Sequence, residues 1–379
     1  MAMIAVWGWT LIALGVCGAG YMLLSVRAAR GSFQTRPPHA AHFPAVTLLK
    51  PLHGDEPNLA ENLESFRTQD YPGAIQLLIG VQSETDTAIR IVEALRREHP
   101  RIDIELIIDP CRHGSNPKIA NLINMMPRAK HDIFVLSDSD IGVGRDYLRS
   151  VIATLQEPNV GAVSCCYIGK SLDNIWSKLS AMGIDYQFLP GVLFGVAMGL
   201  AAPCFGSTIA IRKSTLAEIG GFEAFRDVLA DDYEIGRAVR ARAHRVVFAP
   251  VLVSHTCTER TAGELVRHEL RWARTIRTVE PLGYLGSGIT HAVPLGLIGA
   301  ALTGFSAWAL IALAGVLAVR AFQKQQLDRA FGIGRFPLWL LLMRDMVSFA
   351  VFVSCYFIRR VDWRGVSYRV DAEGALTHE

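Results

Sequence analysis

A shortage of charged residues is the first feature of the sequence. Asp, Glu, Lys and Arg make up 19% of the 379 residues, below the ~25% that is usual for soluble domains. Basic residues exceed acidic ones by only 38 − 35 = 3, and no basic cluster is interleaved with aromatic residues. We therefore expect no nucleic-acid partner. Apolar residues reach 51%, which excludes a disordered chain and indicates that part of the protein lies in lipid.

The cysteines also lack a pattern. The sequence has an odd number of them and neither a CxxC motif nor the spacing of a zinc site; they are Cys17, Cys111, Cys165, Cys166, Cys204, Cys257 and Cys355. This excludes a disulfide framework and a structural metal site, and it fits a catalytic portion that faces the reducing cytosol. For Cys165-Cys166, Cys204 and His255 we expect buried packing roles.

An uncharged run opens the chain. Residues 2 to 26 carry no Asp, Glu, Lys or Arg, and at 1.5 Å per residue they can cross ~30 Å of hydrocarbon. Arg27 and Arg30 follow the run, whereas a cleavable signal peptide has its positive charge before the apolar part. The pattern predicts a retained anchor with its C-terminal end in the cytoplasm, as in a multi-pass protein of the cell inner membrane.

A longer uncharged run covers residues 281 to 319. Its 39 positions are too many for one straight span and predict a hairpin that turns near Thr303-Gly304. The alternative is a single helix from Val293 to Val319 with a preceding segment in the membrane interface.

A last apolar stretch, Phe336 to Phe357, contains the adjacent charges Arg344 and Asp345. In lipid these charges are costly unless they are paired or face protein or an interface. The basic segments on either side, 320–335 and 358–369, both favour the cytoplasmic side. If residues 281–319 cross the membrane twice and residues 336–357 cross it once, the two basic segments cannot both be cytoplasmic. We therefore expect one of these apolar pieces to be re-entrant or monotopic.

The middle of the chain has the pattern of an α/β domain. Short β-rich runs occur at 46–49, Ile75–Val81, Ile102–Ile108, Ile133–Leu136 and Ala162–Ile168, with helical patterns at Pro57–Thr68 and Asp86–Glu98 between them. The alternation predicts a mostly parallel, Rossmann-like sheet with its ligand at the carboxyl ends of the strands. The expected domains are an anchor over 1–30, a cytosolic catalytic domain over 31–280, membrane segments over 281–357 and a basic cytosolic tail over 358–379.

One segment inside this domain reads as apolar. Tyr186 to Ile211 has no charged residue, which is compatible with a membrane span. A single crossing, however, would place the acidic clusters at 138–140 and 231–232 on opposite sides of the bilayer. We therefore favour a lipid-facing element over 186–203, followed by a buried strand over 204–211.

Two carboxylates follow a predicted strand. Asp138-Ser139-Asp140 comes directly after Ile133–Leu136, at the edge of the sheet where ligands bind. The oxygens of Asp138 and Asp140 are suitable ligands for Mg²⁺ or Mn²⁺, which would also bind a diphosphate. The alternative is a solvated turn that caps the next element.

Upstream polar residues have two interpretations each. Lys118, in Asn116-Pro117-Lys118, could meet phosphate oxygens or a nucleotide base, or be an ordinary surface lysine. Asp86 follows the strand that ends at Val81 and could accept hydrogen bonds from a ribose or uracil, or be a helix N-cap.

Downstream, Asp231-Asp232 precedes a predicted helix over Tyr233–Arg242, where acidic residues also favour the helix dipole. His268-Glu269-Leu270-Arg271-Trp272 has a helical pattern. Trp272 beside Arg271 could form an apolar floor with an anion contact, or pack at an interface.

The order of these motifs resembles a known family. The matching segments are Leu48–Gly54, Pro57–Leu59, Asn62–Glu64, Val81-Gln82, Asn116–Ile119, Asp138-Ser139, Gly220-Gly221, Asp232-Tyr233, Trp363–Gly365 and Tyr368-Arg369. This series, which covers about the whole chain, resembles the ceramide glucosyltransferase family of GT-A glycosyltransferases. Among bacterial relatives it is most similar to the hopanoid-biosynthesis branch, whose enzymes add N-acetylglucosamine to bacteriohopanetetrol.

The resemblance implies an α/β fold: a GT-A catalytic domain with a Rossmann-like mixed sheet, an N-terminal transmembrane anchor and C-terminal membrane helices. It implies that Asp86 contacts the nucleotide and that Asp138 binds the metal and the diphosphate. Position 140 is Asp, as in the wider GT-A pattern, so Asp138 and Asp140 could share the metal. Asp232 would be the general base, with Asp231 beside it.

The family's last motif is Gln or Arg, two variable residues, then Arg-Trp. Arg271 and Trp272 match it, whereas His268 departs from it at the first position. By resemblance, His268 joins the residues that bind the donor, and Arg271 and Trp272 join those that act in catalysis. Arg271 or Lys118 would neutralise the departing diphosphate.

The expected function is inverting transfer of a sugar from a UDP-sugar to a hydroxyl of a membrane lipid. The preferred pair is UDP-N-acetylglucosamine and a hopanoid polyol, and the alternative is UDP-glucose and ceramide. A processive polysaccharide synthase needs more membrane elements than the three or four expected here. A non-enzymatic nucleotide-sugar sensor would not need Asp232 or Arg271-Trp272.

Overall fold

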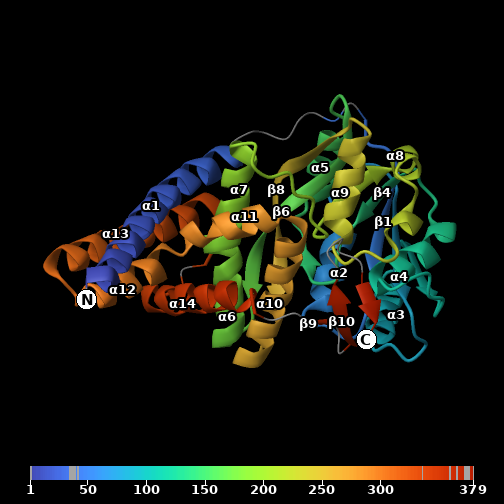
Figure 1. The fold of residues 1–379 in the computed structure, drawn as a ribbon. Coiled ribbons are helices and arrows are strands. Elements are labelled where there is room, and N and C mark those ends of the chain that lie inside the picture. Colours follow the sequence, from blue (N-terminus) through green and yellow to red (C-terminus); the bar gives the residue numbers. More distant parts are fainter. Residues whose placement is uncertain are drawn as a thin grey trace.

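The computed structural model describes residues 2–33, 40, 42–334, 336–357, 360–363, 366–370 and 376–378. A group of apolar helices lies at one end of the molecule and an α/β domain at the other (Figure 1). The α/β domain holds the predicted acidic residues, so its sheet is described first.

Eight strands form one mixed sheet in the order β3-β2-β1-β4-β7-β6-β8-β5. They are β1 (Val46–Pro51), β2 (Ile75–Val81), β3 (Asp103–Ile108), β4 (Ile133–Leu136), β5 (Ile141–Gly142), β6 (Val160–Ser171), β7 (Ile209–Arg212) and β8 (Arg245–Cys257). Strands β1 to β4 are mutually parallel and β6 is parallel to β8, whereas β7 and β5 are antiparallel to their neighbours. The predicted mixed α/β sheet is confirmed.

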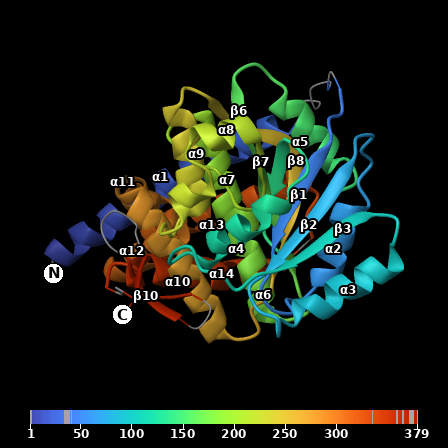
Figure 2. The ribbon, with the colours of Figure 1, turned by 90° about the vertical axis from the view of Figure 1, so that its right-hand side faces the viewer.

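Helices cover both faces of this sheet. The helices of the domain are α2 (Leu59–Arg67), α3 (Ala88–Glu98), α4 (Pro117–Met125), α5 (Tyr147–Leu155), α8 (Lys213–Glu218), α9 (Asp231–Ala241) and α10 (Ala262–Val279), with 3₁₀ turns η1 (Met126–Arg128) and η3 (Phe222–Phe225). One apolar core joins α2, α3 and α5 to the sheet, and a second joins α4, α8 and α9 to its other face (Figure 2). Because both faces are covered, every residue of β1 is buried.

The C-terminal apolar region contains the predicted hairpin. Helix α12 (Ala292–Leu302) and helix α13 (Ala307–Phe331) are joined by a short turn in which Gly304 has φ +63°. The alternative of one helix from Val293 to Val319 is wrong, because the chain reverses at this turn. Helices α11 (Pro281–Gly286), η4 (Ser287–Thr290) and α14 (Leu338–Ser354) complete the region.

Small residues bring the N-terminal helix α1 (Ala2–Ser32) close to α12. A Cβ on Gly15 would lie 3.0 Å from the Ala292 carbonyl oxygen, and one on Gly18 would lie 2.8 Å from the Ala292 Cβ. Close backbone approach through small residues is typical of helices that pack within a membrane.

Three helices in the described part of the chain are long and apolar enough to cross a membrane: Met3–Ser32, Ile175–Ala197 and Ala307–Phe331. The bent pair Pro281–Thr290 and Ala292–Leu302, with 63° between its parts, would be a fourth if it forms one span. These helices indicate a membrane protein.

The predicted lipid-facing element is helical. Helix α6 (Ile175–Gly183), the π-helical turn η2 (Ile184–Phe188) and helix α7 (Leu189–Ala197) follow one another, and Phe194 packs edge-on against Tyr21 of α1 with ring centroids 5.1 Å apart. Figure 1 shows α6 and α7 running across the direction of α1 and α13. The choice between a lipid-facing element and a span stays a prediction. The strand expected over 204–211 is shorter, since β7 begins at Ile209.

Buried ion pairs join the membrane helices to one another and to the catalytic domain. Arg320 of α13 donates from Nε and Nη2 to the two carboxylate oxygens of Asp345 at 2.9 and 2.6 Å. Arg344 donates to both carboxylate oxygens of Glu269 in α10. Of the alternatives for these two charges, both are paired, Asp345 with Arg320 and Arg344 with Glu269. The basic segment that starts at residue 320 continues α13 instead of forming a loop.

The expected C-terminal tail contains a three-stranded antiparallel sheet of β9 (Arg360–Trp363), β10 (Val366–Val370) and β11 (Leu376–His378). Strand β9 lies near α10. Arg364 and Gly365, which belong to the family-like motif at this end, lie outside the described residues.

Candidate active site

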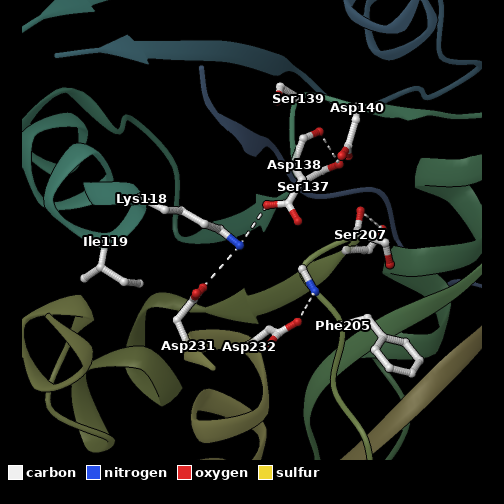
Figure 3. Close-up of polar contacts among 12 residues, drawn as sticks. Lys118, Ile119, Ser137, Asp138, Ser139, Asp140, Phe205, Ser207, Asp231 and Asp232 are labelled. Atoms are coloured by element: carbon white, nitrogen blue, oxygen red, sulfur yellow. Dashed lines mark hydrogen bonds and ion pairs between the residues drawn. The ribbon is translucent and has the colours of Figure 1, made fainter. Parts of the chain in front are cut away.

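Charged residues from three parts of the sequence meet at the carboxyl end of β4. Asp138 follows β4, Lys118 lies in the first turn of α4, and Asp231 begins α9. The Lys118 ammonium lies 2.7 Å from Asp138 Oδ1 and 3.1 Å from Asp231 Oδ2, and so bridges the two acids (Figure 3). The sequence-based prediction that ligand-binding groups gather at this edge of the sheet is consistent with this geometry.

Asn116 positions Lys118 and Asp231 relative to each other. Its side-chain oxygen caps α4 by accepting from the Ile119 amide at 3.1 Å, and Pro117 occupies the first turn, as is usual at a helix start. Its amide group donates to the Val228 carbonyl at 2.7 Å and to Asp231 Oδ1 at 3.3 Å. The start of α4 is therefore tied to the start of α9.

Gly206 holds Asp232 beside this cluster. Its N–H donates to Asp232 Oδ2 at 2.9 Å, and its carbonyl accepts from the Asp138 amide at 3.1 Å. A Cβ at this position would lie 2.6 Å from Asp138 Oδ2 and 2.8 Å from Lys118 Nζ. A side chain at this position would therefore displace the charged pair.

Burial and neighbouring charges shift the pKa values of Asp232, Asp138 and Lys118. Burial, and then repulsion from Asp231, raise the pKa of Asp232 to about 6, against the opposing effect of Lys118. Burial likewise raises the pKa of Asp138, although Lys118 opposes it. Burial favours the neutral form of Lys118, but the nearby carboxylates outweigh it and raise the pKa of this lysine. A carboxylate with the properties of Asp232 can accept a proton near neutral pH.

Asp140 lies on the other side of Asp138 and is held by His255. Its Oδ2 is 3.5 Å from His255 Nδ1. Burial opposes ionisation of Asp140, but the adjacent imidazole outweighs it and lowers the pKa of the carboxyl to about 2. His255 is buried as expected, but its ion pair with Asp140 was not predicted. The pairing follows from the register of β5 and β8, which places Ile141 opposite His255.

Asp138 and Asp140 fit the oxygen set expected for a divalent cation bound together with a diphosphate. Such an ion commonly takes one or two carboxylates and completes its shell with phosphate oxygens and water. Asp140 Oδ1 is buried without a hydrogen-bond partner, so it has the capacity for a further ligand. The described residues contain no group of three or more His, Cys, Asp or Glu side chains that could hold a metal ion. Phosphate oxygens and water would have to complete the shell.

Asp86 has the contacts of a residue at a helix start. Its carboxylate accepts from the Ala88 amide at 2.9 Å and from the Gly54 amide at 2.9 Å. The first contact fits the N-cap alternative, and the second joins the start of α3 to the loop after β1. A nucleotide contact of Asp86 stays a prediction.

Helix α10 brings the last motif beside Asp140. Trp272 lies with its ring centroid 5.7 Å from that of His255 and 4.5 Å from that of His268. His268 in turn is hydrogen-bonded through Nδ1 to Glu259, which is almost fully buried. Arg271 lies on the same turn of α10. Trp272 also packs against Phe188, so the expected apolar floor at Trp272 is compatible with this geometry.

Lys50 is a site residue that the sequence analysis missed. Its ammonium lies 4.1 Å from the centre of the Phe66 ring, 3.4 Å from Ser137 Oγ, and donates to the Asp138 carbonyl oxygen. Burial lowers the pKa of Lys50 to about 7, although Asp138 and Asp140 oppose this. The sequence did contain one indication of this role, since Lys50 is a charged residue in a mostly apolar strand.

The mixed α/β sheet, with charged residues at the carboxyl ends of its strands, has the GT-A fold. The structure is similar to that of the mannosyltransferase PcManGT from Pyrobaculum calidifontis, solved in complex with GDP-Man and Mn²⁺. That similarity has a TM-score of 0.55 at 22% identity and covers 93% of this chain and 98% of that chain.

The chain belongs to glycosyl transferase family 21, whose sequence profile matches residues 8–376. Ceramide glucosyltransferase 1 from Caenorhabditis elegans is 24% identical over 346 residues, which is 88% of this chain and 73% of that protein. An N-acetylglucosaminyltransferase from Bradyrhizobium diazoefficiens is 23% identical over 245 residues, 61% of this chain and 49% of that protein. The predicted glycosyltransferase activity is confirmed at the level of the family, and the non-enzymatic sensor is set aside.

Proposed function

We propose that this protein transfers glucose from UDP-glucose to the hydroxyl of a ceramide-type membrane lipid, with inversion at the sugar. The single observation that carries the chemistry is the cluster in which Lys118 bridges Asp138 and Asp231 beside Asp232. The acceptor and donor are supported by the family match and by the ceramide glucosyltransferases that resemble most of the chain.

Asp232 is the general base in this proposal. A lipid hydroxyl is too weak an acid to attack unaided, so its proton passes to the Asp232 carboxylate while its oxygen bonds to the anomeric carbon. The bond from that carbon to the UDP oxygen breaks on the opposite face, and the configuration inverts. A pKa near 6 suits this role, because the group is ionised at neutral pH yet remains basic.

The other residues neutralise and orient the donor. Lys118 and Arg271 compensate the charge of the departing diphosphate, and Asp86 binds the nucleotide. Asp138 and Asp140 would hold a Mg²⁺ or Mn²⁺ ion, which supplies further positive charge to the diphosphate when bound.

His268 and Trp272 form the floor of the donor site in this proposal. Their rings lie edge to face, and the bond from His268 to Glu259 fixes the imidazole. The family motif has Gln or Arg at the position of His268. A contact between His268 and the donor is therefore a separate part of the proposal and needs its own test.

Transfer of N-acetylglucosamine from UDP-N-acetylglucosamine to a hopanoid polyol is the second candidate. It is favoured by the similarity to the bacterial N-acetylglucosaminyltransferase and by the order of the sequence motifs. The two candidates share the same chemistry and differ only in donor sugar and acceptor lipid. A processive polysaccharide synthase is less well supported, because the described residues contain at most four candidate spans.

The decisive experiment offers each donor with each acceptor to the full chain in lipid nanodiscs and identifies the products by mass spectrometry. We expect a hexosyl ceramide from UDP-glucose, formed about 10²–10⁴-fold more slowly by the Asp232→Asn variant. A hopanoid product alone would establish the second candidate. UDP release without any lipid product would contradict both.

The domain boundaries 1–30, 31–280, 281–357 and 358–379 are part of this proposal, as is the inner membrane with the catalytic domain on the cytoplasmic side. Arg27 and Arg30 at the end of α1 support that orientation. Cys111 is exposed on the catalytic domain. In a Cys17→Ser background, Cys111 should react with an impermeant maleimide only after the membrane is permeabilised, and labelling of intact cells would overturn the orientation.

A further inference from the structure

Two segments at the border of the catalytic domain expose large apolar side chains. In α11, Leu282 and Leu285 are 82% and 61% exposed, and in the loop after α7, Met198 and Leu200 are 61% and 76% exposed. We call these four residues the apolar rim. Single exposed apolar residues are common on soluble proteins, but such pairs close to membrane helices suggest a contact with lipid.

The packing of α11 explains why its leucines face outward. Tyr284 lies between them in the sequence and is buried, with its ring centroid 5.1 Å from that of Phe352 in α14. Its hydroxyl donates to the Phe352 carbonyl at 3.2 Å. Because Tyr284 is fixed on α14, Leu282 and Leu285 are held on the opposite face of the short helix.

The direction of α11 is that of an interfacial segment. The segment Pro281–Thr290 makes an angle of 63° with Ala292–Leu302, which packs along α1. If α1 and α12 cross the bilayer, α11 therefore lies much closer to the membrane plane than to its normal. Short helices in that orientation bury an apolar face about 5–10 Å into the headgroup boundary.

Both parts of the apolar rim are linked to the first turn of α9, which carries Asp232. Glu280, the residue before α11, accepts a hydrogen bond from the Tyr233 hydroxyl at 2.7 Å. The loop that carries Met198 and Leu200 continues to Gly206, whose N–H donates to Asp232 Oδ2 at 2.9 Å. Each exposed segment is thus connected through one hydrogen bond to the proposed general base or to the residue next to it.

We propose that the apolar rim inserts into the lipid–water interface and presents the acceptor lipid to Asp232. The inference rests on the proposed lipid acceptor. The hydroxyl of a membrane lipid lies at headgroup depth, so a rim at that depth lets the hydroxyl reach the base while the acyl chains stay in the bilayer. The rim makes transfer selective for acceptors embedded in a bilayer.

The depth of the rim is measured with nitroxide labels in nanodiscs. Leu282→Cys and Leu200→Cys are made in a background where the exposed Cys17 and Cys111 are serine. Ile108, which is 41% exposed at the end of edge strand β3, is the matched apolar control. We expect the two rim labels to collide with dissolved oxygen more than with a water-soluble nickel complex, and the Ile108→Cys label to show the reverse. Rim labels that behave like the control would overturn the insertion.

Acceptor delivery is measured with polar variants of the rim. We expect Leu282→Asn with Leu285→Asn to lower kcat/KM for long-chain ceramide in nanodiscs by about tenfold, while kcat/KM for a short-chain, water-dispersed ceramide and the KM for the donor stay unchanged. Ile108→Asn should change none of them. Equal losses on both ceramides, or no loss on either, would overturn the delivery role. If the unmodified protein transfers sugar to neither lipid, the proposed function fails, whereas the label depths still test the rim.

Discussion

In the described part of the chain, two groups of buried charges are built differently. Beneath the catalytic domain, Arg320 binds Asp345 and Arg344 binds Glu269, each through two hydrogen bonds. At the sheet edge the carboxylates outnumber the lysines. The acids there are Asp138, Asp140, Asp231 and Asp232, and the lysines are Lys50 and Lys118.

The difference separates a structural layer from a reactive one. A buried guanidinium and carboxylate that pair one to one leave no net charge for a ligand, although Arg344 Nε has no hydrogen-bond partner. The lower group therefore holds helices together. An excess of carboxylates shifts pKa values and leaves oxygens such as Asp140 Oδ1 without a partner. We expect substitutions in the first group to change stability, and substitutions in the second to change the reaction.

Asp232→Asn should have the largest effect on the reaction. The amide keeps the size of the side chain but cannot accept the acceptor proton, so we expect kcat to fall by about 10²–10⁴-fold while affinity for the UDP-sugar is nearly kept. Calorimetry of donor binding and lipid glycosylation on one purified variant measure the two quantities.

Asp231→Asn is the matched control, because Asp231 begins the same helix and binds Lys118 directly. It should change donor binding more than the proton-transfer step. If Asp232 only favoured the start of α9, its loss would cost ~0.3–1 kcal/mol of stability with little change in rate. An Asp232→Asn enzyme that transfers sugar at a normal rate would make Asp231 the next candidate base.

Arg344→Met tests the other side of the comparison. It leaves the Glu269 carboxylate buried without its partner, so we expect a loss of about 3–5 kcal/mol in the free energy of unfolding. The double variant Arg344→Met with Glu269→Leu should recover most of that stability, because no unpaired charge remains. Thermal unfolding in one detergent gives both values. A single variant as stable as the parent would mean that the pair does not join α14 to α10.

Asp138→Ala should lower kcat/KM on the order of 10²-fold, through weakened stabilisation of the diphosphate. Asp140→Ala should cost less, since Asp138 lies between Lys118 and Asp140 and has both as neighbours (Figure 3). Titration of activity with Mg²⁺ or Mn²⁺ after treatment with EDTA measures the metal requirement of each variant. Undiminished turnover in excess EDTA would remove the metal from the mechanism, and a larger loss in Asp140→Ala would reverse the assignment.

The sequence was sufficient to predict the parallel strands β1 to β4 and the acids at their carboxyl ends, but not β5 or β8. Chain order places the ends of parallel strands and the starts of following helices at one edge, and Asp138, Lys118 and Asp231 occupy such positions. The turn at Gly304 was also predictable, because a run of 39 uncharged residues cannot form one straight span.

The contacts of Asp138 and Asp140 with Lys50 and His255 depend on strand pairings between distant parts of the sequence. His255 meets Asp140 only because β8 pairs with β5, and these strands are more than 100 positions apart. Lys50 meets the Asp138 carbonyl because β1 pairs with β4. Periodicity within a segment contains no information on either register, so these partners could not be predicted from the sequence.

The smallest expected effect is the pH dependence that follows from the excess of carboxylates around Asp232. Burial and repulsion from Asp231 raise its pKa to about 6, so the ionised base is the main form at pH 8 and the minor form at pH 5. We expect kcat/KM, measured at saturating metal, to be level above pH 7 and to fall tenfold per pH unit well below 6. Asp231→Asn removes the repelling charge and should move this midpoint to lower pH, whereas Glu269→Gln, in the paired group, should leave it in place. A midpoint near 4 in the unmodified protein would show that the carboxylates at the sheet edge are as well satisfied as the pairs beneath them.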